Sequence, residues 1–234
     1  MEIIGAIDIC GDTHFDLGAI NYWISNGNVN NLIHVGDFIT GDSKAINQIG
    51  ELGNKLNKAN KWLFVSQGNH CNPLMHDDRI YGGEYGGVKL LKRGTIANWN
   101  NENILFCGGA ISIDRNNRIP GISWWENEEF VPCYPKIPID HVITHVSIPE
   151  VNGVSVYSPN VLHWSTNDGD LIHDLMMEQQ IVRNWINELI AQGHPIKTWH
   201  YGHYHQSIQS EYNGIKCRCL AINEIAPFNR KPYT

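Results

Sequence analysis

Short apolar runs recur along the chain, and most of them stop at a glycine that lies next to an aspartate, asparagine or histidine. Runs of this length, rich in β-branched and aromatic residues, predict β-strands, and a nearly unbroken apolar run predicts a strand covered on both faces. We therefore expect strands at residues 3–10, 31–35, 61–65, 88–91, 95–99, 104–107, 140–144 and 198–201, and a hairpin of 207–212 and 215–220 turned by Asn213 and Gly214.

Other segments repeat their apolar residues at helical spacing. Gly50 and Gly53 weaken one of these patterns, whereas the last is long and regular. The expected helices are residues 17–26, 43–56 and 168–192. Strand and helix alternate over the first 65 residues, which predicts a parallel sheet built from right-handed crossovers.

Two segments show no clear period. Residues 115–134 are polar and aromatic and predict a long ordered loop, and residues 146–167 are rich in Gly, Pro, Ser and Asn and predict a lid or rim loop. Short strands between 88 and 107 make a second sheet plausible on pattern alone.

Composition narrows the class of protein. With 234 residues, 42% of them hydrophobic, we expect a single domain over residues 1–234. The formal net charge is −7 and no basic run occurs, so a small phosphorylated substrate is compatible but a long nucleic acid is not expected as a partner. The six cysteines predict reduced, buried thiols, and no apolar run approaches membrane-spanning length, so we expect no membrane association and a cytoplasmic location.

The strand ends collect polar side chains suited to metal binding. Each has an ordinary explanation alone, because Asp and Asn are common beside glycine in turns and a lone His is usually structural. Together, carboxylates, imidazoles and one amide suit two divalent ions of the Mn, Fe, Co, Ni or Zn kind, with manganese preferred. The set is Asp12, His14, Asp37, Asn69, His70, His145, His203 and His205.

In order along the chain, these residues lie in D-x-H, G-D, G-N-H, H and G-H-x-H motifs. The ordered set resembles the signatures of the calcineurin-like metallophosphoesterases. The resemblance implies an α/β fold of four layers, an α-β-β-α sandwich of two mixed β-sheets flanked by helices.

The resemblance also implies a role for each residue. One metal is held by Asp12, His14 and His205, the other by Asn69, His145 and His203, and Asp37 bridges the two. A hydroxide bridging the two metals attacks phosphorus, and His70 is the catalytic residue that protonates or hydrogen-bonds the leaving oxygen.

Two positions depart from better-known relatives of the family. Cys71 follows the G-N-H motif where many relatives have an acidic residue, and Thr40 stands where protein Ser/Thr phosphatases have the acidic partner of the catalytic histidine. A neutral Thr cannot raise an imidazole pKa, so we expect a smaller protonated fraction of His70. Protein phosphatase activity is correspondingly disfavoured.

Residues 108–126 resemble a segment of poorly characterised bacterial and phage members of this superfamily. Arg115 or Arg118 would clamp a phosphate, and Trp124 or Trp125 would stack on a base or sugar. The alternative is structural: an Asp114–Arg115 ion pair, with the two Trp side chains packing the loop onto the sheet.

These expectations lead to a metal-dependent phosphoesterase that hydrolyses a small phosphomonoester, with a nucleotide among the candidates. A phosphodiesterase or nuclease of the same fold is one alternative, and a non-catalytic binding scaffold is another. The sequence leaves the physiological substrate, the native metal and the oligomeric state open.

Overall fold

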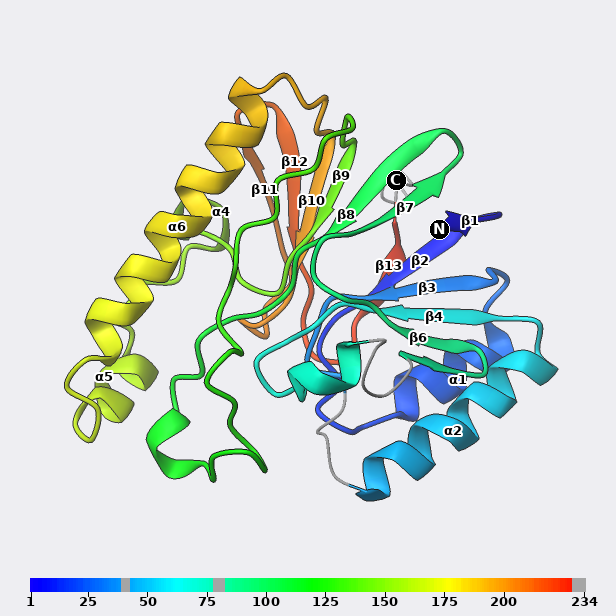
Figure 1. The fold of residues 1–234 in the computed structure, drawn as a ribbon, viewed down its shortest axis with the longest axis horizontal. Coiled ribbons are helices and arrows are strands. Elements are labelled where there is room, and N and C mark those ends of the chain that lie inside the picture. The colour runs from blue at the N-terminus through cyan, green and yellow to red at the C-terminus, as the bar shows by residue number, and fades with distance from the viewer. Residues whose placement is uncertain (39–42, 78–82, 229–234) are drawn as a thin grey trace.

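Two β-sheets pack against each other face to face (Figure 1). This computed structural model describes residues 1–38, 43–77 and 83–228. The seven-stranded sheet runs β1 (Glu2–Ile3), β7 (Thr95–Trp99), β8 (Glu102–Phe106), β9 (His141–Ile143), β10 (Thr198–Tyr201), β12 (Ile215–Cys219) and β11 (Ile208–Tyr212). The six-stranded sheet runs β13 (Ile225–Pro227), β2 (Ile7–Cys10), β3 (Asn31–His34), β4 (Trp62–Val65), β6 (Val88–Leu90) and β5 (Glu84–Tyr85).

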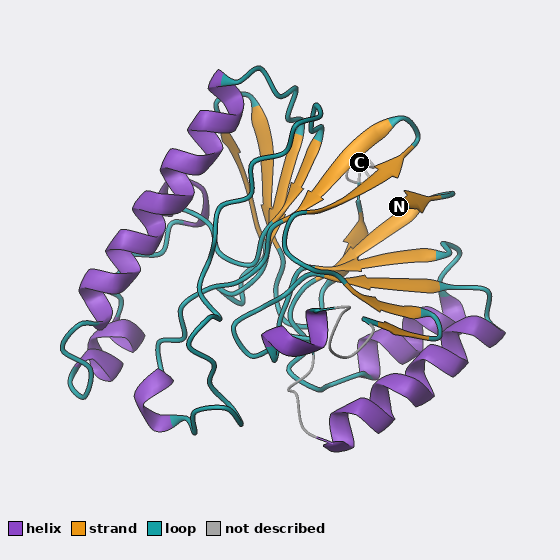
Figure 2. Ribbon diagram, in the orientation of Figure 1, coloured by secondary structure: helices purple, strands orange, loops and turns teal. Residues whose placement is uncertain are grey.

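Helices cover the outer faces of both sheets (Figure 2). On the six-stranded sheet lie α1 (Gly18–Asn26) and α2 (Ser43–Lys58); on the other lie α4 (Pro149–Asn152) and α6 (Leu171–Ala191), with α5 (Pro159–Ser165) packed beside α6. Short 3₁₀ helices span Pro73–His76 and Arg115–Asn117. The layers follow the order helix, sheet, sheet, helix, as expected. Of the helices in the described ranges, none combines the length and apolar character that a membrane crossing requires.

Alternation along each central strand explains why the sheets are buried on both faces. In β2, Ile9 points into the core between the sheets, while Cys10 points toward the helices; in β3, Ile33 and Leu32 divide in the same way. All four side chains are fully buried. A continuous apolar run is therefore the correct pattern for these strands.

The strand expected at residues 3–10 is two strands. β1 pairs in parallel with β7 of the seven-stranded sheet, and β2 pairs with β3 of the other. Gly5 lies between them with φ of +95°, a conformation that L side chains rarely adopt, so the chain can change sheets there. The apolar pattern of residues 3–10 does not show that the chain passes from one sheet to the other at this point.

Several smaller elements also differ from the expectation. β5 and β13 were not expected because each has only two or three residues, and β13 pairs antiparallel with β2. The rim segment 146–167 contains α4 and α5. Gly53 is needed in α2 because β5 passes close to the helix. A Cβ at position 53 would collide with the backbone carbonyl of Tyr85.

The cysteines are free, as expected. Five of the six are buried and Cys133 is partly exposed.

Candidate metal centre

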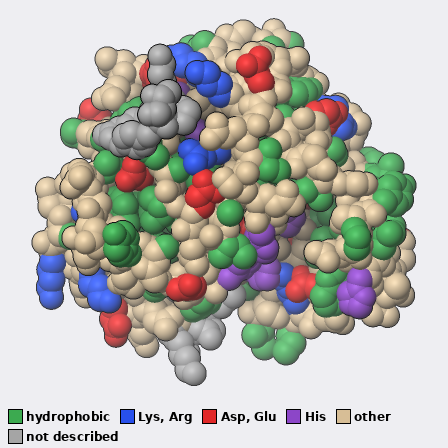
Figure 3. Space-filling model, turned by 180° about the vertical axis from the view of Figure 1, so that it is seen from behind, with side chains coloured by type: hydrophobic (Ala, Val, Ile, Leu, Met, Phe, Trp, Pro, Cys, Tyr) green, Lys and Arg blue, Asp and Glu red, His purple; other side chains and the backbone are tan. Residues whose placement is uncertain are grey.

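The candidate ligands lie on loops that follow five strands. Asp12 and His14 follow β2, Asp37 follows β3, and Asn69 follows β4; His145 follows β9, and His203 and His205 follow β10. The pairs β2–β3, β3–β4 and β9–β10 are all parallel, so their carboxyl ends meet at the same edge of each sheet. Histidine side chains gather on the face seen in Figure 3.

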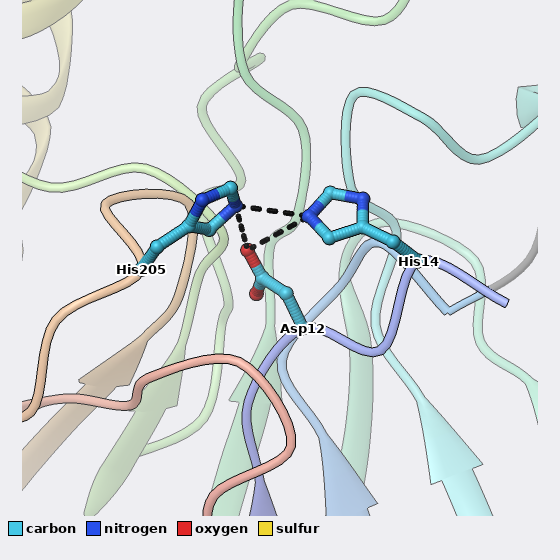
Figure 4. A group of neighbouring side chains, drawn as sticks. All are labelled: Asp12, His14 and His205. Carbon is cyan, nitrogen blue, oxygen red and sulfur yellow. Dashed lines mark hydrogen bonds and ion pairs between the residues drawn. The ribbon is translucent and has the colours of Figure 1, made fainter. Parts of the chain in front are cut away.

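One donor group consists of Asp12, His14 and His205 (Figure 4). The Nε2 atoms of the two histidines lie 2.9 Å apart, and Oδ2 of Asp12 lies 3.3 Å from Nε2 of His205 and 4.0 Å from Nε2 of His14. The three side chains thus point their donor atoms at a common point.

A second donor group surrounds the amide oxygen of Asn69. Oδ1 of Asn69 lies 3.0 Å from Nε2 of His145 and 3.1 Å from Nδ1 of His203. His145 is fully buried and Asn69 nearly so. An amide oxygen and two imidazole nitrogens again converge.

Asp37 lies between the two groups. Its Oδ2 is 3.3 Å from Nε2 of His145 and 3.9 Å from Nδ1 of His14. Burial alone would raise the pKa of Asp37, but the facing imidazoles hold it well below its usual value. Conversely, burial would lower the pKa of His145, but Asp37 and Asp12 raise it to about 9. The two carboxylates therefore make this a site of negative potential that favours cations.

Glycines in the motifs make room for the ligands. A Cβ at Gly68 would collide with the backbone nitrogen and carboxylate of Asp37, and one at Gly202 would collide with the carboxylate of Asp12. The G-N-H and G-H-x-H motifs therefore need glycine because another strand's ligand occupies the space that a side chain would take.

Backbone strain is concentrated in the same loops. Four of the candidate ligands have positive φ: 43° at His14, 53° at Asp37, 67° at His203 and 54° at His205. Such conformations cost non-glycine residues on the order of 1–3 kcal/mol each. Contacts between the loops hold them in place; for example, the backbone N–H groups of Thr13 and His14 both donate to the carbonyl of Asp37.

The donor atoms fit divalent cations. Oδ1 of Asp12 is buried yet has no hydrogen-bond partner, which is costly unless a further group binds it. Burial lowers the pKa of His14 and of His203, so both favour the neutral form that ligates metals. Mixed imidazole, carboxylate and amide oxygen donors suit borderline first-row ions.

His70 lies beside this centre and contacts an arginine. Its backbone N–H donates to Oδ1 of Asp37 at 2.7 Å, and Nη2 of Arg118 donates to its Nε2 at 2.6 Å. Burial lowers the pKa of His70, and Arg118 adds to this against the opposing charge of Asp37. The sequence predicted a smaller protonated fraction of His70 from the neutral residues Thr40 and Cys71. Thr40 lies outside the described residues. In the part of the chain that the structure describes, burial and the charge of Arg118 lower the pKa of His70.

Ser112 was not singled out in the sequence. Its Oγ accepts from Nδ2 of Asn69 and from Nη1 of Arg118, both at 2.9 Å. The first bond orients the Asn69 amide so that its oxygen faces the two histidines. A serine in the loop that follows β8 offers no local signal for such a role, because its partner Asn69 is distant in sequence.

One cavity of about 390 Å³ opens at the centre and includes only one of the four residues predicted to contact substrate. Arg118 lines it together with Asp37, Asn69 and His70. The cavity lining does not include Arg115, Trp124 or Trp125.

Existing contacts explain why Arg115 lies elsewhere. Its guanidinium donates to both carboxylate oxygens of Asp168, at 2.6 and 3.1 Å, and to Asp174 at 2.7 Å. The Asp114–Arg115 ion pair considered above does not form; Asp114 instead pairs with Arg118 at 2.6 Å, and the two residues flank the short 3₁₀ helix. Trp125 is only 7% exposed, and Trp124 is partly buried.

Comparison with solved structures supports the fold. One crystal structure shares 13% identity with a TM-score of 0.50 over 92% of this chain and 90% of that chain. Weaker matches include a novel archaeal phosphodiesterase (15% identity, TM-score 0.43, 92% of this chain and 83% of that chain) and a phosphopantetheinyl hydrolase from Mycobacterium tuberculosis (13%, 0.48, 93% and 90%). No curated protein sequence matches the chain.

A family model gives the assignment. The model described as calcineurin-like phosphoesterase matches residues 5–207, a span that contains every candidate ligand described above. With that match and the converging donor groups, the chain belongs to the calcineurin-like phosphoesterase family of metal-dependent phosphoester hydrolases.

Proposed function

We propose that the chain hydrolyses a small phosphomonoester, with nucleotides among the candidate substrates, at a centre of two divalent cations of which manganese is the first candidate. The observation that carries the proposal is that two donor groups on either side of Asp37 adjoin a single cavity that also contains Arg118 and His70. Phosphate binding and leaving-group chemistry can therefore take place in one enclosed space.

The cations would be held by the residues that converge there. Asp12, His14 and His205 would hold one and Asn69, His145 and His203 the other, with Asp37 between them. When bound, the cations would supply neutralisation of the phosphate charge and a more acidic water.

Arg118 and His70 provide the remaining groups. The guanidinium of Arg118 is fixed by Asp114, Ser112 and His70, and from the cavity wall it would donate to phosphate oxygens. His70 would hydrogen-bond or protonate the leaving oxygen. Arg118 is the only Lys or Arg among the described residues lining the cavity, which supports a substrate with one phosphate over a polynucleotide.

A substrate panel tests the proposal. Protein loaded with Mn, Ni, Co, Zn or Mg is assayed on p-nitrophenyl phosphate, bis-p-nitrophenyl phosphate and nucleoside monophosphates. Faster turnover of the monoester supports the proposal, and faster turnover of the diester reassigns the chain as a phosphodiesterase. Metal-bound protein that is inactive on the whole panel identifies a binding scaffold.

His70→Ala tests the leaving-group role. We expect kcat to fall by roughly 100-fold or more, because general acid or base groups contribute about that much, while elemental analysis still finds two metals per chain. Exposed His173→Ala is the control for loss of an imidazole. An unchanged kcat in His70→Ala removes His70 from the mechanism.

We also propose a location for the protein in the cell. The six free thiols support a reducing compartment, from which we infer the cytoplasm. Cell fractionation with an antibody to the chain checks this.

A further inference from the structure

The cavity extends well beyond the metal centre, and its composition changes along the way. At the metal side it is lined by Asp37, Asn69, His70 and Arg118; the rest of the lining combines apolar side chains with polar ones such as Ser158, Asn160 and Gln179. We call the apolar part the side arm and define it by Ile113, Val156, Val161, Trp164 and Leu175.

The side arm is built by a separate hydrophobic cluster. Val156, Val161 and Leu175 belong to this cluster, and Ile113 and Trp164 pack against it from partly exposed positions. Figure 1 shows the elements involved: α5 lies beside the N-terminal end of α6, on the side toward which β9 and β10 direct their carboxyl ends. The side arm is therefore continuous with the place where a phosphate would bind.

The cavity offers little positive charge to a ligand. Arg118 is the one Lys or Arg in the described lining, and it already contacts His70. Glu178 is buried, its Oε1 accepts from the backbone N–H of Phe130 at 3.0 Å, and burial raises its pKa to about 7. With no second Lys or Arg in the described lining to pair with it, a second phosphate on the leaving group is disfavoured in the side arm.

Trp164 supplies the feature that selects an occupant. It is the one Trp in the described cavity lining and is partly exposed, so part of its side chain lines the space that a ligand would occupy. Aromatic rings that stack gain free energy beyond the burial of their area. The side chains of Ile113, Val161 and Leu175 offer no hydrogen-bond partner to a hydroxyl group, so the part of the cavity that they line suits an apolar ring.

We propose that the side arm binds an uncharged aromatic leaving group, so that the preferred substrate is a phosphomonoester whose alcohol carries an aromatic ring stacked on Trp164. This rests on the proposed function, because it places the phosphate of such an ester at the metal centre. A nucleobase and a simple aryl group share this chemistry.

Binding of two phosphonates to the manganese-loaded protein tests the side arm without turnover. By isothermal titration calorimetry, phenylphosphonate is expected to bind about tenfold or more tightly than methylphosphonate, as the burial of a ring implies. Trp164→Ala should remove most of the difference in Kd between the two phosphonates and leave the Kd of methylphosphonate unchanged. Trp164→Phe should keep most of that difference in Kd. Trp124→Ala, the matched control outside the cavity, should keep all of it.

Equal Kd values for the two phosphonates in the wild type would contradict the proposal that the side arm binds an aromatic ring. They would not contradict the proposed function, because both phosphonates would still bind. A Trp164→Ala variant that weakens both phosphonates alike also overturns the side-arm proposal. If neither phosphonate binds, the proposed function fails, and the side arm fails with it.

Turnover distinguishes the two sources of an aromatic ring. Adenosine 5′-monophosphate and ribose 5-phosphate share the same primary phosphate ester, and phenyl phosphate adds a ring without a sugar. A kcat/KM for adenosine 5′-monophosphate at least about tenfold above that for ribose 5-phosphate supports a nucleobase in the side arm. If ribose 5-phosphate is as good a substrate as both aromatic esters, the proposal is overturned.

Discussion

The loops of the metal centre and the wall of the side arm are built in opposite ways. Each metal loop directly follows a strand, and Gly36, Gly68 and Gly202 make room for a ligand that another strand delivers, as Gly68 does for Asp37. Most of the wall comes from residues 146–167, which show no clear period, with Leu175 added from α6. Residues 115–134 also lack a clear period, and there Arg115 and Arg118 differ by three positions yet have unrelated partners. Metal ligands that lie in local motifs can thus be predicted from the sequence. The residues that line the side arm depend on which distant segments pack together in the fold.

The largest effect should come from filling the space beside a metal ligand. In Gly68→Ala, the new Cβ collides with Asp37, so we expect loss of at least one metal by elemental analysis and a fall in kcat/KM of roughly 100-fold or more. Gly50→Ala is the matched control, since nothing lies within 4 Å of a Cβ there. It should keep activity and stabilise α2 by roughly 0.5–1 kcal/mol. Full metal content and activity in Gly68→Ala would contradict this view of the motif.

The two arginines should separate activity from stability. Arg118→Ala should lower kcat/KM by roughly 100-fold, as expected for losing a charged donor to phosphate. Arg115→Ala should leave kcat/KM nearly unchanged but lower the free energy of unfolding by roughly 1–3 kcal/mol, because it leaves Asp168 buried without its partner. Urea denaturation and steady-state kinetics on both variants measure the pattern.

Arg183→Ala is the control for that pair, because its ion pair with Glu150 is more exposed and should contribute about 0–1 kcal/mol. The interpretation is wrong if Arg115→Ala loses activity and Arg118→Ala does not.

The last effect is confined to the pH dependence of stability and concerns a buried carboxyl that bonds Ser112, next to Ile113 of the wall. Oε1 of Glu128 accepts from the backbone N–H of Ser112 at 2.8 Å, while its buried Oε2 has no partner. Burial raises the pKa of Glu128 from 4.5 to about 7. The folded protein therefore keeps a proton that the unfolded chain releases above about pH 4.5, and the free energy of unfolding falls as pH rises to about 7, by roughly 3 kcal/mol at most.

Glu128→Gln should remove that pH dependence. The variant should unfold at the same urea concentration as the wild type near pH 4.5 and at a higher concentration at pH 8. Glu211→Gln, which removes an exposed carboxylate, should follow the wild type. Parallel losses of stability in Glu128→Gln and wild type would show that Glu128 is not the group responsible.

The sequence by itself determined the alternation of strands and helices and the set of polar residues that follow the strands. This was possible because strands, caps and turns depend on neighbouring residues, and because parallel strands deliver their carboxyl ends to a common edge of their sheet. The four-layer sandwich came from the resemblance of the ordered motifs to a known family. The packing of the two sheets against each other then brings the ligands that follow β2, β3 and β4 to those that follow β9 and β10.

The tertiary structure decided which side chains support those ligands and which line the cavity. Ser112 bonds Asn69 across 43 positions, and Arg115 bonds Asp168 across 53. Trp164 lines the cavity, whereas Trp124 and Trp125, which a stacking role would suit equally well on residue type, do not. Such contacts join segments whose spacing has no local period, so only the packing of α5 and α6 against the strand-end loops could select among them.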